Sequence, residues 1–290
     1  MPHIVIFAEA RDWHGRRLAR ALRDLGATAT TRSLPHCGFA LGGAGPGIVI
    51  PGIDSLPDAV LVKTLASGSF EQVTLRLGLL HALARLGVPV VNDARAIERC
   101  VDKAMTSFLL HRAGIPIPET LATEDAAWAA QAIAESKSDL VQKPLFGSQG
   151  RDLARVAPGG ALPLAAGSYA GVHYLQRFIG RDNGWQDFRV MVIGGAPIAA
   201  MRRRGTSWIT NVHQGARCEA VTISRELAEL SVGAVEAVGA DYAGVDLIED
   251  PEGRLRVLEV NSMPAWRGLQ SVAPCDIALR VARHVIARLG

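Results

Sequence analysis

Short apolar runs and helical patterns alternate over the first third of the chain. Residues 4–7 are continuously apolar, as in a buried strand, and the following residues place Leu18 and Leu22 on one helical face until Gly26 ends the pattern. The same signals recur in three further apolar runs and one helix, at residues 48–50, 59–62, 88–91 and 70–86. This alternation predicts a small parallel α/β domain over residues 1–97.

The pattern changes to mixed α+β from about residue 98. A helix is expected through residues 101–109, and the chain then stays extended because Pro116 and Pro118 each exclude the α region for the preceding residue. Helices are predicted at residues 125–136, 224–239 and 276–289, and strands at 139–143, 172–178, 188–193, 197–201, 244–248 and 255–260. We therefore expect a central domain over residues 98–175 and a C-terminal domain over residues 176–290.

Composition and charge narrow the class of protein. The chain has 290 residues, of which 49% are hydrophobic and 20% charged, and its formal net charge is +3. It has no run of 18 apolar residues, no basic segment typical of a signal peptide near its start, and four scattered cysteines, so we expect a cytoplasmic protein with reduced thiols and no membrane partner. The 27 arginines and 4 lysines are interspersed with acids, so nucleic-acid binding is not expected.

A lysine at the end of a predicted strand precedes a loop that suits an anion. Lys143 is followed by Gly147, Ser148, Gln149 and Gly150. Glycine allows the backbone to turn its N–H groups toward a phosphate, and lysine supplies a compact positive charge. No Lys-Ser or Lys-Thr pair follows the glycines, so the loop is not a Walker A motif. A hairpin turn without a ligand is the alternative interpretation.

Three oxygen-bearing side chains are expected on two neighbouring strands near the C-terminus. Glu259 and Asn261 are two residues apart and so project from one face of their strand, while Asp246 lies on the preceding strand of a predicted hairpin. Carboxylate and amide oxygens, completed by substrate phosphates and water, suit Mg²⁺. The alternative is a solvent-exposed face with paired charges.

A run of arginines follows the predicted strand at residues 197–201. Guanidinium groups bind phosphate in a bidentate manner, which makes the cluster of Arg202, Arg203 and Arg204 a candidate for phosphate contact. In a chain so rich in arginine, ordinary surface charge is the alternative.

Taken in this order, the motifs resemble the ATP-grasp superfamily, in its RimK-like branch of ATP-dependent carboxylate–amine ligases. The resemblance covers residues 60–280. Besides the motifs above, it rests on Asp102-Lys103, Tyr174-Leu175-Gln176-Arg177-Phe178-Ile179, Asp187-Phe188-Arg189-Val190, Thr210-Asn211 and Glu259-Val260-Asn261-Ser262-Met263-Pro264. Segments outside this shared machinery, at residues 68–74, 92–102 and 266–270, are similar to the tetrahydromethanopterin:glutamate ligases of the same branch.

The resemblance implies a fold and a reaction. The expected architecture is α/β and α+β: a Rossmann-like pre-ATP-grasp domain that binds substrate, a small central α+β domain and a C-terminal α+β domain. The expected enzyme is ADP-forming, proceeds through an acyl phosphate, and adds an amino acid, L-glutamate, to a carboxylate of a small cofactor such as a tetrahydromethanopterin-type pterin. ATP and two Mg²⁺ ions, replaceable by Mn²⁺, are the implied cofactors, and a homodimer or homotetramer is the implied assembly.

Two other functions stay open at this point. One is a RimK-like glutamate ligase that acts on a protein tail or an amino-acid carrier. The other is a catalytically inactive ATP-binding scaffold protein, against which the retention of the lysines, the arginines and the metal-binding side chains argues.

The resemblance also implies roles for individual residues. Catalysis falls to Arg202 and Lys143, with Arg203 as the substitute. ATP binding falls to Lys103, Lys143, Gly147, Ser148, Gln149, Gly150, Gln176, Arg177, Phe178, Asp187, Thr210 and Asn211, and metal binding to Asp246, Glu259 and Asn261. Arg177 stands where the family usually has an acid, so its backbone is expected to serve adenine.

Two loops after strands of the N-terminal domain are candidates for the acceptor site, because open α/β sheets bind ligands at the carboxyl ends of their strands. In the first loop, Trp13 is a candidate to stack on a planar group such as a pterin. In the second, Lys63 is a candidate to bind a carboxylate. For the first loop, helix capping by Asp12 with Trp13 as a packing contact is the alternative.

Overall fold

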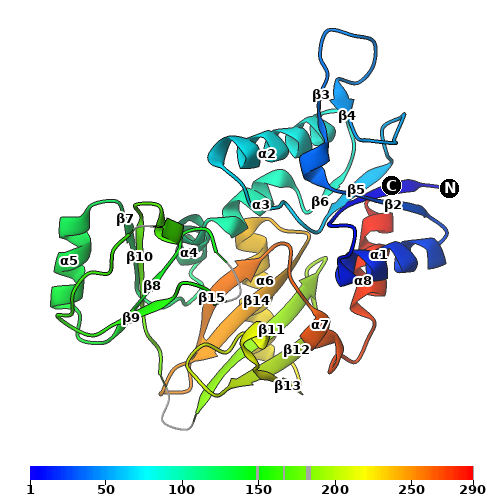
Figure 1. Cartoon of the computed structure of the whole chain (residues 1–290). Helices are drawn as coiled ribbons and strands as arrows, with labels where there is room; N and C mark the ends of the chain where they lie inside the picture. Colours follow the sequence, from blue (N-terminus) through cyan, green and yellow to red (C-terminus); the bar gives the residue numbers. More distant parts are fainter. Residues whose placement is uncertain (148–149, 166, 181–183, 290) are drawn as a thin grey trace.

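Three sheets, with a short two-stranded ladder beside the first, organise the described part of the chain. The structure, a computed structural model, describes residues 1–147, 150–165, 167–180 and 184–289. The sheets belong to the N-terminal, central and C-terminal regions, which surround a common centre in Figure 1. No helix within those ranges is both long and apolar enough to cross a membrane.

A parallel sheet with the strand order β2-β1-β5-β6 forms the N-terminal domain. Its strands are β1 (His3–Phe7), β2 (Thr28–Arg32), β5 (Ala59–Val62) and β6 (Val90–Val91), and its helices are α1 (Trp13–Asp24), η1 (Leu34–His36), α2 (Phe70–Arg85) and α3 (Ala94–Val101). Helix α2 begins with a capping box, in which Ser69 accepts from the backbone of Gln72 and the Gln72 side chain accepts from the backbone of Ser69. The apolar run at residues 48–50 does not extend this sheet: β4 (Ile48–Val49) pairs with β3 (Gly38–Phe39) in the separate ladder.

The last helix of the chain completes the N-terminal domain. Helix α8 (Ile277–Ala287) lies beside α1 in Figure 1, and both contribute to one apolar core that also contains Ile4 and Ile6 of β1. The two chain ends therefore lie close together on the same domain (Figure 1).

The central domain is an antiparallel sheet with the order β7-β10-β8-β9. Its elements are α4 (Lys103–Arg112), β7 (Thr120–Thr123), α5 (Ala126–Glu135), β8 (Leu140–Lys143), β9 (Ala154–Val156), η2 (Gly167–Tyr169) and β10 (His173–Arg177). The single helix expected through residues 101–109 is in fact divided. Helix α3 ends at Val101, and the Asp102 carboxylate accepts from the backbone N–H groups of Ala104 and Met105 and so starts α4.

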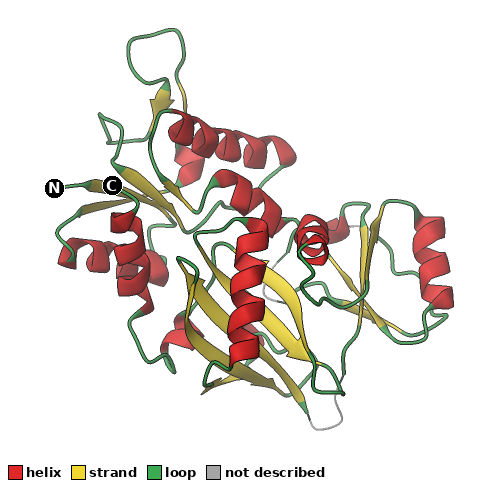
Figure 2. Ribbon diagram, turned by 180° about the vertical axis from the view of Figure 1, so that it is seen from behind, coloured by secondary structure: helices red, strands yellow, loops and turns green. Residues whose placement is uncertain are grey.

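The C-terminal domain is an antiparallel sheet with the order β13-β12-β11-β14-β15. Its elements are β11 (Trp185–Ile193), β12 (Ala196–Gly205), η3 (Val212–Gln214), β13 (Arg217–Ala220), α6 (Arg225–Val238), β14 (Tyr242–Glu249), β15 (Leu255–Asn261) and the short α7 (Arg267–Gln270). Helix α6 crosses one face of this sheet (Figure 2), where its apolar residues pack on Val190, Val245 and Val260. The opposite face is apolar where it meets the N-terminal domain and polar toward the central domain.

One side chain ties the N-terminal domain to the C-terminal sheet. The amide of Asn92, fully buried, donates to the carbonyls of Tyr242 and Ser262 at 2.8 and 2.5 Å, and accepts from the N–H groups of Asp241 and Tyr242 at 2.7 and 3.0 Å. These four bonds satisfy both N–H donors and both acceptor positions of the amide group. The Asn92 side chain thereby joins the N-terminal domain to the C-terminal sheet.

Candidate functional site

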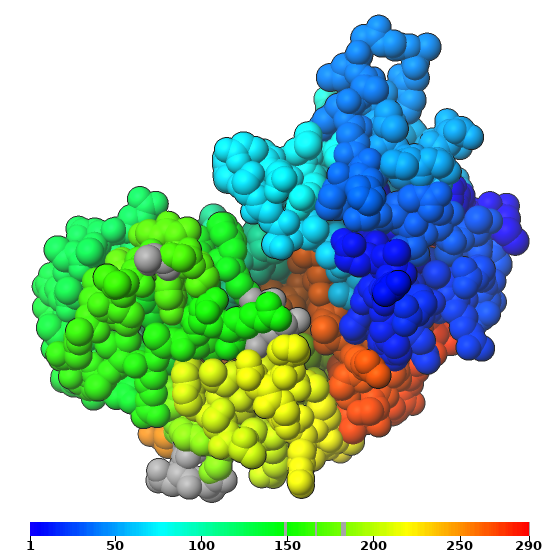
Figure 3. Space-filling view, in the orientation of Figure 1, coloured from blue at the N-terminus to red at the C-terminus, as the bar shows by residue number. Residues whose placement is uncertain are grey.

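A cleft lies between the central sheet and the polar face of the C-terminal sheet. Figure 3 shows a hollow where the green central domain, the yellow C-terminal strands and the blue N-terminal domain meet. The cleft encloses about 930 Å³ of space, a figure that includes the part open to solvent. Of the residues predicted for the site, it is lined by Lys103, Lys143, Gly147, Gly150, Gln176, Arg177, Phe178, Asp187, Arg203, Thr210, Asn211, Asp246 and Glu259.

The register of the C-terminal strands explains why acids and arginines share one face. Asp187 on β11 is paired with Arg203 on β12, and Asp246 on β14 is paired with Glu259 on β15. Arg189, two residues after Asp187, is paired with Asp246. Because successive side chains alternate between faces, these residues point toward the cleft side while their neighbours pack under α6.

Four of these side chains form a buried network of ion pairs. Arg203 donates from Nε to Asp187 at 2.6 Å and also lies 3.1 Å from Asp246. Arg189 donates from Nε and Nη2 to the two oxygens of Asp246, each at 2.6 Å. Two acids and two guanidinium groups balance in formal charge, which is the condition under which buried charges are tolerated.

The network shifts the pKa values of its two acids in opposite directions. Burial would raise the pKa of Asp246, but the guanidinium groups of Arg189 and Arg203 outweigh it and hold this pKa below the ordinary value. Burial dominates at Asp187, so its pKa is raised although Arg203 opposes the shift. Asp246 is therefore the acid that is held ready as an anion, as a metal ligand requires.

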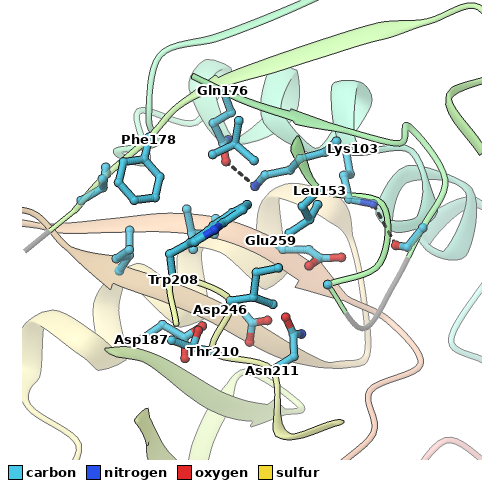
Figure 4. A pocket seen from close by; sticks show the side chains of 18 of the residues that line it. Lys103, Leu153, Gln176, Phe178, Asp187, Trp208, Thr210, Asn211, Asp246 and Glu259 are labelled. Carbon is cyan, nitrogen blue, oxygen red and sulfur yellow. Dashed lines mark hydrogen bonds between the residues drawn. The ribbon is translucent and has the colours of Figure 1, made fainter. Parts of the chain in front are cut away.

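The two predicted phosphate-binding lysines line the cleft on its central-domain side, where Lys103 is labelled in Figure 4. Nζ of Lys143 donates to Oε1 of Gln176 at 2.6 Å, and Nζ of Lys103 donates to the carbonyl of Gly147 at 2.9 Å. Burial lowers the pKa of Lys143 to about 8, with the Lys103 charge acting in the same direction and Glu259 opposing it. A phosphate group is the kind of partner that would restore full protonation of this amine.

The side chain of Gln176 lines the cleft and is held by three hydrogen bonds. Its amide nitrogen donates to the hydroxyls of Thr120 and Tyr174, while its oxygen accepts from Lys143. The Gln176 side chain therefore positions Lys143, and its predicted part in binding adenine stays a prediction.

The glycine loop reaches the C-terminal domain at Gly150. A Cβ at this position would lie 2.5 Å from Oδ1 of Asn211 and 2.6 Å from Cγ2 of Ile209, and its φ is +68°. Only glycine fits such a close approach with that backbone angle. Ser148 and Gln149, which were predicted to belong to the same loop, lie outside the described residues.

An aromatic and aliphatic slot occupies the end of the cleft beside residues 176–179, where the chain leaves β10. The rings of Phe178 and Trp208 are 5.9 Å apart and nearly perpendicular, and both are labelled in Figure 4. The other apolar lining residues are Val141, Leu153, Ile179, Ile209, Ile248 and Leu258. This apolar and aromatic lining has the chemistry to contact a nucleobase.

Two backbone N–H groups beside the slot are already engaged within the central domain. The N–H groups of Arg177 and Phe178 donate to the carbonyls of Glu119 and Asp139, both at 2.8 Å. The predicted backbone contact with adenine at these residues would therefore have to involve a carbonyl, which suits the amino group of adenine.

The predicted metal-binding residues offer oxygen donors on adjacent strands. Asp246 and Glu259 are register partners that line the cleft, and Asn261 lies opposite Gly244 one step further along the same face. The described ranges contain no cluster of three or more His, Cys, Asp or Glu side chains. Two carboxylates and an amide, completed by phosphate oxygens, nevertheless fit the oxygen preference of Mg²⁺.

The structure separates Arg202 from the cleft. Arg202 lies on the α6 face of β12, where its guanidinium is 5.3 Å from the centre of the Phe188 ring, and it is not among the residues that line the cleft. Arg203 lies on the cleft face, so of the two predicted arginines it is the one placed where a phosphate could be contacted. The physical reason is the alternation of side chains along a strand whose register is set by its pairing with β11.

Comparison with known proteins identifies the family. The sequence profile of the RimK-like ATP-grasp domain matches residues 100–285, well over half of the chain. The chain belongs to the RimK-like ATP-grasp family. The predicted family and fold class are thereby confirmed.

Two relatives of this ATP-grasp protein, and one solved structure with a similar fold, carry ligase names. The tetrahydromethanopterin:alpha-L-glutamate ligase of Methanococcus maripaludis is 40% identical over 197 residues, which are 66% of this chain and 67% of that protein. The alpha-aminoadipate–LysW ligase LysX of Saccharolobus solfataricus is 30% identical over 191 residues, 63% of this chain and 69% of that protein. The ATP-grasp ligase PsnB, in a structure with a minimal precursor, Mg and ADP, is 25% identical with a TM-score of 0.76 over 99% of this chain and 97% of that one.

In this ATP-grasp protein, the first candidate acceptor loop is a capped helix start. Asp12 accepts from the N–H of Gly15 at 2.8 Å and caps α1, as the alternative interpretation expected. Trp13 packs edge-on against the fully buried Trp266 at 5.1 Å between ring centres, and the N–H of Trp266 donates to His14 at 3.1 Å. The loop is thus fastened to the chain that follows β15.

Lys63, the second candidate, is buried at the same junction. Its Nζ donates to the carbonyl of Met263 at 3.2 Å, and only 7% of the residue is exposed. Burial lowers the pKa of Lys63, while the charge of Asp12 opposes the shift.

Sequence reasoning missed several residues of the ATP-grasp site. Leu153, Trp208, Ile248 and Leu258 line the slot, and Arg189 holds Asp246. Arg189 was within reach of the alternation rule, since it is two residues after Asp187 on one strand. Trp208 lies in a loop, where no periodic pattern in the sequence predicts which way a side chain points.

Proposed function

We propose that this chain is an ATP-dependent, ADP-forming carboxylate–amine ligase that adds L-glutamate to a carboxylate of a small cofactor of the tetrahydromethanopterin type. The observation that carries the ATP part is one cleft in which Lys103 and Lys143 face the carboxylates of Asp246 and Glu259, with an apolar slot at one end. The substrate part is supported by the 40% identical relative named as a tetrahydromethanopterin:alpha-L-glutamate ligase.

The energetic problem of the reaction is the approach of anions. A carboxylate oxygen attacks the γ-phosphorus of ATP, the bond to the β-phosphate oxygen breaks, and ADP leaves. Lys103 and Lys143 bring two ammonium groups to one wall of the cleft, and Arg203 brings a guanidinium to the other. Preorganised charge of this kind is often the largest contribution to catalysis, since it needs no rearrangement at the moment of reaction.

Metal binding fits the same site. We propose that Asp246, Glu259 and Asn261 would hold Mg²⁺, that Glu259 would serve as a ligand for two ions, and that Mn²⁺ would substitute. When bound, the metal neutralises the β- and γ-phosphate oxygens. Asp187, by resemblance assigned to the ribose hydroxyls, is engaged with Arg203 and is more directly suited to holding that guanidinium in place.

The second half of the reaction needs protection from water. The amino group of glutamate attacks the acyl carbon, phosphate leaves, and an amide bond forms. The close approach of Gly150 to Ile209 and Asn211 supports a glycine loop that covers the cleft during the reaction. Excluding water in this way preserves an acyl phosphate.

A second candidate is ligation to an amino-acid carrier or protein tail. The 30% identity with the alpha-aminoadipate–LysW ligase LysX favours this possibility. It differs from the main proposal only in the acceptor, so the test is a choice of acceptors.

The experiment is incubation of the chain with ATP, MgCl₂, glutamate and a panel of acceptors that contains pterin and furan cofactor precursors and an acidic carrier peptide. The proposal predicts ADP release and a pterin product heavier by one glutamyl residue. Product from the carrier peptide alone would favour the second candidate, and no ADP release with any acceptor would contradict both. Light scattering on the same sample tests the proposed dimer or tetramer.

A further inference from the structure

Arg189 occupies the junction between the predicted metal site and the N-terminal domain. Its Nε and Nη2 hold the carboxylate of Asp246, and its Nη1 donates to the carbonyl of Ala265 at 3.2 Å. Only 13% of its side chain is exposed. It is not one of the residues that line the nucleotide cleft, because it lies beyond Asp187 on β11, on the side away from Trp185 and the slot.

Gly244 and the loop that follows β15 lie next to the side chain of Arg189. A Cβ on Gly244 would lie 3.0 Å from Cβ of Pro264 and at an ordinary contact distance, 3.7 Å, from Cδ of Arg189, so glycine lets the loop that follows β15 approach β14 closely beside the arginine. The loop that accepts from Arg189 continues to Trp266, which is bonded to His14 and packed on Trp13. One end of this guanidinium thus faces the carboxylate of Asp246, which is a predicted metal ligand. The other end faces the loop after β15, which contacts the N-terminal domain.

The two arginines of the network differ in what they lose when a cation binds Asp246. Arg203 keeps its bidentate partner Asp187. Arg189 has Asp246 as the one carboxylate with which the described structure pairs it, and would keep only the neutral carbonyl of Ala265. Arginine stays protonated in proteins, and a buried charge without a counter-ion is strongly unfavourable.

We infer that Arg189 receives the reacting carboxylate of the acid substrate, exchanging Asp246 for it when the cation binds. This inference rests on the proposed function and names the residue that holds the acid. The substrate is the anion in the right place: phosphates are met by Lys103 and Lys143 on the opposite wall, whereas Arg189 faces the N-terminal domain. Before binding, Arg189 is paired with Asp246. After binding, Arg189 is paired with the substrate carboxylate and Asp246 with the cation, so no charge is left without a partner.

A binding consequence follows from the exchange. Without the acid, the cation competes with Arg189 for Asp246; with the acid, the guanidinium is already engaged. Cation and acid therefore favour each other's binding, and by reciprocity each raises the affinity of the other by the same factor.

The test compares Arg189→Gln, Arg189→Lys and the control Arg204→Gln, which removes an exposed arginine of β12 paired with Glu219. Binding of Mn²⁺ is measured by electron paramagnetic resonance with ADP present and no acid. We expect about tenfold tighter Mn²⁺ binding in Arg189→Gln, a factor typical of coupled sites, and no change in Arg204→Gln. Equal or weaker Mn²⁺ binding in folded Arg189→Gln would overturn the inference.

A kinetic measurement separates substrate binding from a structural role. With a competent acid, Arg189→Gln should raise KM for the acid at least tenfold and leave KM for glutamate within twofold. Arg189→Lys keeps a positive charge beside Asp246 but loses the bidentate contact. It should therefore raise KM for the acid less than Arg189→Gln does, again with little change in KM for glutamate. Equal changes in both KM values would overturn the inference. If the wild type releases no ADP with any acid, the proposed function fails, while the Mn²⁺ comparison still decides the competition at Asp246.

Discussion

Replacing Gly150 by alanine tests whether the close approach of Gly150 to the C-terminal domain is needed for activity. The added Cβ would lie 2.5 Å from Asn211 Oδ1 and 2.6 Å from Ile209 Cγ2. Both distances are roughly 1 Å shorter than a favourable contact between non-bonded atoms. The loop of Gly150→Ala is therefore expected to withdraw from the C-terminal domain.

The magnitude follows from a matched control. Gly159 has nearly the same φ, +67°, but a Cβ there would meet nothing within 4 Å. Alanine in the left-handed region costs about 1–2 kcal/mol at either position, so the free energy of unfolding should fall by a similar amount in both variants. The clash is specific to Gly150→Ala, and the difference between the two variants reports on it alone.

The assay is ADP release at varied ATP concentration, together with thermal unfolding of each variant. We expect kcat/KM for ATP to be at least tenfold lower in Gly150→Ala than in Gly159→Ala, which corresponds to about 1.4 kcal/mol of lost transition-state stabilisation. Equal kcat/KM values in the two variants would refute the reasoning, because the loop would then not need the close approach seen here.

The remaining predictions concern charge and the domain contact. Lys143→Ala should abolish ADP release, whereas the exposed Lys137→Ala should not change it. Glu259→Gln should remove metal-dependent turnover, with the exposed Glu252→Gln as its control. Because the pKa of Lys143 is about 8 and the protonated amine binds phosphate, kcat/KM for ATP should fall as the pH rises through about 8. Asn92→Ala leaves buried backbone groups without partners and should lower the free energy of unfolding by about 2–4 kcal/mol, measured in urea.

Each of these expectations has a result that would contradict it. Full activity of Lys143→Ala would remove the lysine from the ATP site, and an unchanged Mg²⁺ requirement in Glu259→Gln would remove the acid from the metal site. A flat profile of kcat/KM between pH 7 and about 9.5 would show that Lys143 does not titrate there in the free protein. An unfolding midpoint of Asn92→Ala equal to that of the wild type would mean that the four bonds add no net stability.

Alternation along strands predicted the parts of the site that lie on regular elements. The same-face placement of Glu259 and Asn261, and the hairpin that brings Asp246 beside them, follow from a period of two and a turn signal. The choice between Arg202 and Arg203 was not predictable in this way. It depends on which face of β12 meets the cleft, and that is fixed by pairing with β11 across the sheet.

Other differences arise from local signals that are weak or compete. Residues 28–32 form β2 although they are rich in threonine and lack an apolar run, because pairing with β1 supplies the order. The apolar pattern through residues 101–109 predicted one helix, while the capping preference of Asp102 divided it. Trp208 enters the cleft from a loop, where tertiary packing alone sets the direction of the side chain.

Transfer of isotope from the acid tests the central claim most directly. The chain is incubated with Mg-ATP, glutamate and an acceptor whose carboxylate carries ¹⁸O, and the released phosphate is analysed by mass spectrometry. Attack of the carboxylate on the γ-phosphorus predicts ADP and phosphate with one ¹⁸O for each amide formed. Amide formation with unlabelled phosphate, or with AMP and pyrophosphate in place of ADP, would contradict the account.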